Sequence, residues 1–191
     1  MVFIGLLLIK LVISNKGDYY IMINIRKRIF ETNSSSTHAL CISKKDDYEF
    51  PNVLYFKLGN FGWNEEIIYG YNELASYLWT AICDLYGYND YKYFEDYKNY
   101  LYEVLYEYGV ECDFETPVYT EYGSLDNDVY VNHVGELDEI LKTLKNSPKK
   151  LIRFLFAPDS FIITGNDNSD WYFDKMETLD FSNVDVIEKS N

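Results

Sequence analysis

The chain has 191 residues, of which 31 are acidic and 17 basic, so its formal net charge is −14, and 18% of its residues are aromatic. The aromatic content argues against a disordered chain, and the negative charge opposes general binding to nucleic acid, which depends on neutralising phosphates. Cys41, Cys83 and Cys112 are odd in number and contain no CxxC pair, which argues against a disulfide scaffold and predicts reduced thiols in the cytoplasm.

The first 14 residues are mostly apolar. The stretch is shorter than the roughly 20 residues of a membrane-spanning helix, and it lacks the basic start and the small-residue cleavage site of a secretory signal. Residues 16–18 can be encoded by a good ribosome-binding sequence, and Met22 follows at a workable distance. We therefore expect residues 1–21 to be an untranslated leader, with an apolar strand or helix, or an anchor, as the alternatives. Residues 22–191 then form a single domain.

Three strands are predicted in the first third of the domain because β-branched, aromatic and other apolar residues gather there. They are residues 23–30, 39–43 and 53–58. Between the first two lies a polar loop, residues 33–38, with the sequence NSSSTH. If these two strands pair as a hairpin, the basic residues on them come together at the end away from the polar loop.

The middle of the chain is predicted to be helical. Apolar residues keep a spacing of three and four from Asn72, a competent cap, to Gly87. A broad stripe of tyrosine, leucine and phenylalanine, mostly facing the core, predicts a second helix over residues 90–108. A third helix is predicted over residues 134–145.

The last part is predicted to return to strands, at residues 150–156, 160–164 and 171–173. The Gly-Asn-Asp-Asn segment at residues 165–168 has the turn chemistry of a hairpin. The order strands, helices, strands indicates an α+β fold. We expect a largely antiparallel sheet of N- and C-terminal strands, packed with about three helices from the middle of the chain.

Charge is unevenly distributed along the chain. Residues 46–141 hold 21 acidic and 3 basic side chains. Ten basic residues gather in two short windows: Arg26, Lys27, Arg28, Lys44, Lys45, Lys142, Lys145, Lys149, Lys150 and Arg153. An acidic body with one or two basic patches follows, and such patches can steer a small anion.

The polar loop permits three interpretations. Hydroxyls and backbone N–H groups of a tight loop can hold a phosphate or carboxylate. Alternatively, His38 takes a proton from Ser35 or Ser36, with Asp167 or Asp170 orienting the imidazole; Thr37 is the poorer partner because neighbours in a strand point to opposite sides. In the third interpretation the side chains only shape a long turn.

Residues 30–40, FETNSSSTHAL, resemble the N-terminal signature of an uncharacterised protein family of low-GC Gram-positive bacteria and their phages. In that family the serine-rich motif lies a few residues after the initiator methionine, which agrees with a start at Met22. Residues 160–168 resemble a late segment of the same proteins less specifically, and Ala39 stands where a serine is commoner. The resemblance implies a site at the polar loop and a phage or mobile-element setting, without supplying a reaction.

The primary hypothesis is that the polar loop binds a small phosphate-bearing or other anionic ligand, and whether it also processes that ligand stays open. The candidate catalytic residues are His38, Ser36 and Ser35, and the candidate ligand-binding residues are Asn33, Ser34, Thr37, Arg26, Arg28, Lys44 and Asp167. No cofactor, metal or membrane partner is expected. The alternative hypothesis is an acidic mimic of nucleic acid that inhibits a basic host nuclease or defence protein.

Overall fold

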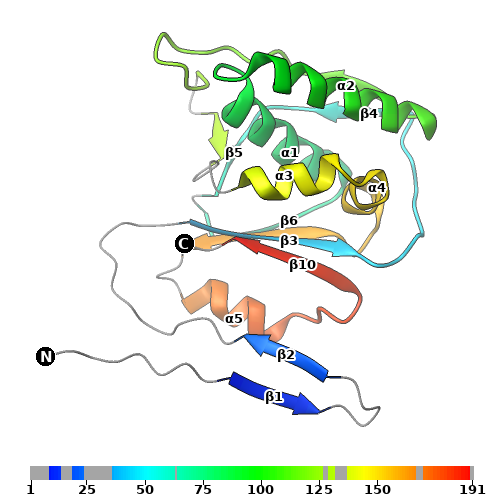
Figure 1. Ribbon diagram of the computed structural model, residues 1–191, viewed down its shortest axis with the longest axis vertical. Helices are drawn as coiled ribbons and strands as arrows, with labels where there is room; N and C mark the ends of the chain where they lie inside the picture. Colours follow the sequence, from blue (N-terminus) through cyan, green and yellow to red (C-terminus); the bar gives the residue numbers. More distant parts are fainter. Residues whose placement is uncertain are drawn as a thin grey trace, which may run out of the picture. The chain divides into compact units, whose positions relative to one another are not determined.

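The computed structural model in Figure 1 describes residues 9–13, 19–23, 36–62, 64–126, 129–131, 137–166 and 170–189. The chain divides into two compact units, residues 1–33 and 34–191. In the first unit, β1 (Ile9–Ile13) and β2 (Tyr19–Ile23) pair antiparallel, with Ile9 opposite Ile23. Most of the predicted strand at residues 23–30 lies outside the described residues. In the described part of the chain, every helix is too short or too polar to cross a bilayer.

The second unit is built on an antiparallel sheet with the strand order β10-β3-β9-β6. One of its strands follows the polar loop and two come from the C-terminal part, so the predicted α+β class and antiparallel sheet are confirmed. Neither β6 nor β10 was predicted from the sequence. The strands are β3 (Ser36–Ser43), β6 (Glu66–Tyr69), β9 (Phe161–Asn166) and β10 (Val184–Lys189).

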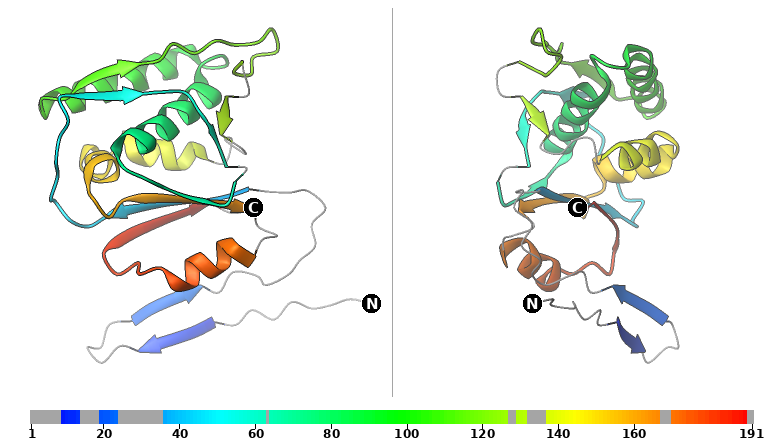
Figure 2. Two further views of the ribbon diagram at one scale, coloured as in Figure 1. Left: turned by 180° about the vertical axis from the view of Figure 1, so that it is seen from behind. Right: turned by 60° about the vertical axis from the view of Figure 1, so that its left-hand side comes forward.

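The two faces of this sheet are buried in separate cores, because successive side chains of a strand alternate between faces. Leu40 and Ile42 belong to the larger core, together with the helices on one side. Ala39 and Cys41 belong to a smaller core with Tyr172. Figures 1 and 2 show three helices (α1, α3 and α4) on one side of the sheet and α5 on the other.

The helices predicted from residues 72, 90 and 134 are confirmed, with changed ends. They are α1 (Tyr71–Tyr86), α2 (Tyr91–Glu107) and α3 (Asp138–Lys145). The expected cap Asn72 lies inside α1, which instead follows Gly70 at a φ of 81°. Asp90 caps α2 by accepting a hydrogen bond from the Tyr93 backbone N–H at 3.1 Å.

The strand predicted at residues 150–156 is wrong, because this stretch is the helix α4 (Pro148–Phe156). Ser147 caps it by accepting a hydrogen bond from the Lys150 N–H, and Pro148 occupies the first turn, where its missing N–H costs nothing. A contiguous apolar run does not distinguish a buried strand from a buried helix. In this stretch the Ser147 cap and Pro148 favour the helix over the strand.

The strand predicted at residues 171–173 is also wrong, because these residues lie in α5 (Asp170–Thr178). Strand β9 has β3 and β6 as its neighbours, so it forms no hairpin with the segment that follows it. Tyr172 packs so closely on Gly165 that a Cβ there would lie 2.9 Å from the tyrosine.

Two small parallel strand pairs complete the fold. They join β4 (Val53–Phe56) to β7 (Glu111–Phe114) and β5 (Asn60–Phe61) to β8 (Tyr130–Val131). The predicted strand at residues 53–58 is therefore confirmed at its start and ends two residues earlier. Helix α1 packs against both pairs, so it forms the centre of the larger core.

Candidate functional site

Only part of the predicted polar loop lies within the described residues, and that part is a strand. Ser36 is the first residue of β3, followed by Thr37 and His38. The predicted loop therefore overlaps the first three residues of β3, because its polar residues were interpreted as turn formers. Six further candidate residues of this site lie outside the described residues: Asn33, Ser34, Ser35, Arg26, Arg28 and Asp167.

His38 is a buried core residue that is paired with a tyrosine of α1. It is 2% exposed, and its Nδ1 forms a hydrogen bond of 2.9 Å with the Tyr77 hydroxyl. Tyr77 also packs on Phe61, with ring centroids 5.5 Å apart, and burial raises the pKa of the Tyr77 phenol. Thr37 is equally buried on the other face of the sheet. Both side chains therefore contribute to packing on the two faces of β3.

The condition that residues 23–30 pair with residues 39–43 as a hairpin is not met, because β3 has β9 on one side and β10 on the other. Lys44 lies beyond the far end of β3, roughly 20 Å along the strand from His38. Its ammonium forms an ion pair with Asp185 at 3.6 Å. Lys44 therefore does not approach His38.

The second basic patch is largely offset by carboxylates of the same chain. Asp46 accepts from Arg153 Nε at 2.7 Å and from Lys149 Nζ at 3.0 Å. These hydrogen bonds, that to Arg153 first, hold the pKa of Asp46 well below its ordinary value. Lys45 is paired with Asp159 in the same way. These cations therefore have less capacity to steer an anion than the sequence indicated.

The tyrosines of α2 differ in exposure: Tyr97 is buried, Tyr93 and Tyr100 are partly buried, and the others are exposed. The Tyr97 and Tyr100 hydroxyls donate to the Leu141 and Leu144 carbonyls of α3, at 2.7 and 3.0 Å. The exposed set, which we call the tyrosine ridge, consists of Tyr91, Tyr102 and Tyr106.

The ridge lies beside unpaired acidic residues. Tyr102 and Tyr106 are 52% and 68% exposed, and their rings stack at 6.0 Å with an interplanar angle of 13°. Five exposed carboxylates accompany them on α2 and on β7, which packs beside α2: Asp96, Glu103, Glu107, Glu111 and Asp113. Within the described part of the chain, no basic side chain forms an ion pair with any of the five.

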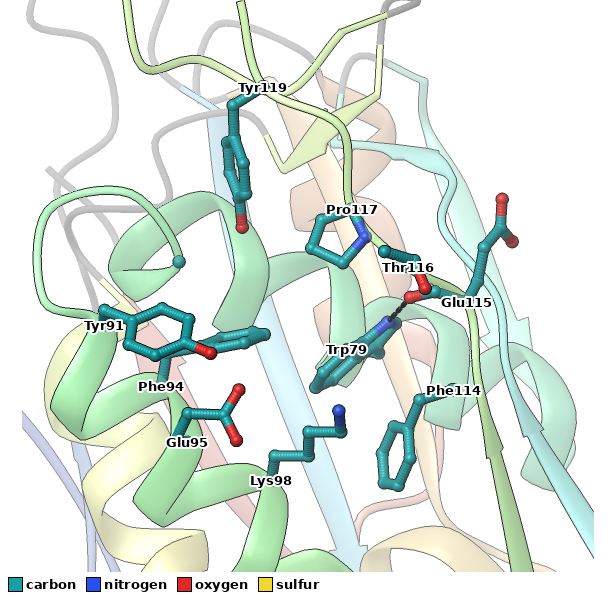
Figure 3. A pocket seen from close by; sticks show the side chains of 11 residues that line it. Trp79, Tyr91, Phe94, Glu95, Lys98, Phe114, Glu115, Thr116, Pro117 and Tyr119 are labelled. Atoms are coloured by element: carbon teal, nitrogen blue, oxygen red, sulfur yellow. Dashed lines mark hydrogen bonds between the residues drawn. The ribbon is translucent and has the colours of Figure 1, made fainter.

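A cavity of about 300 Å³, the aromatic cavity, opens between α1, α2 and the segment after β7. Its floor consists of aromatic rings: Trp79 lies 5.4 Å from Phe94 and 4.7 Å from Phe114, between ring centroids. The Trp79 indole donates to the Glu115 carbonyl at 2.9 Å. Figure 3 shows the rings around the opening.

One wall of the aromatic cavity depends on a glycine. The Tyr119 hydroxyl donates to the Cys83 carbonyl at 3.1 Å, near the C-terminal end of α1. A Cβ at Gly87 would overlap the Tyr119 hydroxyl, so only glycine lets the tyrosine approach the helix end. Sequence reasoning missed this cavity because Gly87 was interpreted only as a helix stop.

A second, more open cavity of about 550 Å³ lies along β5 and β6 and carries two carboxylates, Glu66 and Glu73. Burial, and then the charge of Glu73, raises the pKa of Glu66. No group of three or more histidine, cysteine, aspartate or glutamate side chains suited to a metal ion occurs among the described residues. His38 lines neither this cavity nor the aromatic cavity.

Comparison with known proteins found no matching family model, no matching curated protein and no matching solved structure.

Proposed function

We propose that this chain is a binding protein for a basic protein partner, which it holds through the tyrosine ridge and the carboxylates of α2 and β7. The observation that carries the proposal is the stacked, exposed pair Tyr102 and Tyr106 beside carboxylates without ion-pair partners in the described chain. Exposed aromatic rings are enriched among the residues that dominate binding energy at interfaces.

The charge of the chain suits such a partner. Unpaired carboxylates on one surface attract a basic groove and accelerate its association. Flat rings among carboxylates are a pattern similar to the bases and phosphates of nucleic acid. A nucleic-acid-binding protein is therefore the expected partner, and the resemblance to phage proteins favours a host nuclease or defence protein.

The test is affinity capture from a bacterial extract, followed by titration of each captured protein in purified form. We expect a true partner to be displaced by duplex DNA and to bind more weakly as salt rises, because screening weakens exposed charge interactions. The variant Tyr102→Ala/Tyr106→Ala should lose at least tenfold in affinity, about 1.4 kcal/mol.

Tyr122→Ala is the matched control, because Tyr122 is 86% exposed but lies outside α2. Its affinity for the partner should match that of the unmodified chain. The proposal fails if no captured protein is displaced by DNA, or if the two variants lose affinity equally.

Anion binding at residues 33–38 is the second candidate function. It rests on the run of hydroxyl and amide side chains that precedes His38 in the sequence. Inorganic phosphate and nucleotides should then raise the thermal midpoint by mass action. The Ser36→Ala variant should lose this gain, and an unchanged midpoint in the unmodified chain would remove this candidate.

A further inference from the structure

The aromatic cavity and the tyrosine ridge lie on one flank of α2. Residues 91, 95, 98, 102 and 106 follow one another at spacings of three or four, which places them on one stripe of the helix. Tyr91, Glu95 and Lys98 line the cavity, and Tyr102 and Tyr106 continue the stripe. A partner that contacts the ridge therefore also reaches the mouth of the cavity.

The floor of the cavity already holds a cation of the chain itself. Lys98 Nζ lies 5.7 Å from the centroid of the Phe114 ring. Ammonium and guanidinium groups are attracted to the faces of aromatic rings within about 6 Å. The floor is thus suited to a positively charged group, and the Lys98 stem is flexible enough to leave it.

The Glu95 carboxylate accepts a hydrogen bond from the Tyr91 hydroxyl in the same cavity, and this bond raises the pKa of the Tyr91 phenol. An ionised carboxylate has about four acceptor sites, so it can still accept from further donors. Figure 3 shows the Glu95 carboxylate directed into the cavity and the Glu115 carboxylate directed away from it. In the described chain Glu95 forms no ion pair with Lys98, although both line the cavity one helical turn apart. A carboxylate in this position can accept two parallel hydrogen bonds from a guanidinium.

We propose that the aromatic cavity receives an arginine side chain of the basic partner, stacked on the aromatic floor and bonded to Glu95, with the Lys98 ammonium displaced into solvent. The inference rests on the proposed function, because it names the residue of the partner that binds beside the acidic face, by which we mean the tyrosine ridge with the carboxylates of α2 and β7. Arginine fits better than lysine because its planar guanidinium both stacks on rings and presents a fork to a carboxylate.

The experiment measures binding of fluorescein-labelled octaarginine and octalysine to the full chain by fluorescence anisotropy at low salt. Both peptides carry the same charge, so the acidic face alone would bind them similarly. We expect octaarginine to bind on the order of tenfold more tightly, a difference of about 1.4 kcal/mol.

Two pairs of variants distinguish binding in the aromatic cavity from attraction by the overall negative charge of the chain. Glu95→Gln should reduce the affinity for octaarginine to that for octalysine, whereas Glu103→Gln, which removes the same charge outside the cavity, should weaken both peptides equally. Lys98→Met should strengthen octaarginine binding more than Lys92→Met does, because only Lys98 competes for the aromatic floor.

The outcomes distinguish the two proposals. If neither peptide binds at low salt, the acidic face does not recognise basic partners, and both proposals are wrong. If both peptides bind with equal affinity, or if Glu95→Gln and Glu103→Gln have the same effect, the arginine site is wrong while the acidic face stands.

Discussion

At the scale of single residues, His38 is the clearest difference between expectation and structure. A histidine after six small polar residues is the pattern of an acid or base in a loop. In the structure its imidazole is buried and bonded to the Tyr77 hydroxyl at 2.9 Å. A buried polar group needs a partner, and the tyrosine that supplies it is 39 positions away.

We expect the hydrogen bond between His38 and Tyr77 to contribute measurably to the free energy of unfolding. Tyr77→Phe leaves the ring in place and removes the hydroxyl, so it should lower the free energy of unfolding by about 1–3 kcal/mol. Chemical denaturation measures this change. Tyr102→Phe is the control, because its hydroxyl belongs to a half-exposed ring on the ridge.

The double variant His38→Leu/Tyr77→Phe tests the pair itself. Replacing both polar partners removes the unsatisfied group, so the two losses should not add. Strict additivity would mean that the hydrogen bond contributes nothing to stability.

At the scale of elements, α4 and α5 show where apolar patterns are ambiguous. The run Leu151 to Phe156 contains five buried residues in six positions, which a central strand would also show. The cap at Ser147 and the proline after it were the local signals of a helix. In the sequence they directly follow the third predicted helix, so the same residues also indicate the end of that helix.

Helix α4 is also tied to the segment after β3 through Asp46, and this tie predicts a pH dependence. The Arg153 hydrogen bond lowers the pKa of Asp46 in the folded state. A lowered pKa stabilises the fold above the unfolded value of about 4, and the contribution is lost as the pH falls below it. Asp46→Asn should therefore destabilise the protein at pH 7, with a difference that shrinks below about pH 4.

Denaturation midpoints of both proteins between pH 7 and 3 measure this effect. Asp96→Asn is the matched control, because it removes an exposed carboxylate that has no ion-pair partner in the described chain. A constant difference between the unmodified chain and Asp46→Asn down to pH 3 would contradict the assignment.

At the scale of the whole molecule, the charges that are left without ion-pair partners in the fold differ from the charges counted along the sequence. The basic residues near Lys44 and Arg153 are paired with carboxylates of the same fold. The carboxylates around the tyrosine ridge have no such partners in the described chain. The described surface around the tyrosine ridge is therefore acidic, and this is why we expect salt to weaken binding.

The sequence alone determined the features that depend on neighbouring residues. The spacing of apolar residues placed α1, α2 and α3, and the clusters of β-branched and aromatic residues placed β3, β4 and β9. The acidic excess of the middle also followed from the sequence. The expectation that the tyrosines of α2 mostly face the core is wrong, because only Tyr97 is buried, whereas Tyr91, Tyr102 and Tyr106 are exposed.

Only the tertiary structure decided which distant segments meet. The pairing of β3 with β9 and β10, the bond from His38 to Tyr77 and the pairing of Asp46 with Arg153 all join residues far apart in the chain. The aromatic cavity likewise needs α1, α2 and the segment after β7 together. Periodicity and capping report on contacts within a few residues, whereas these contacts form only when the whole core closes.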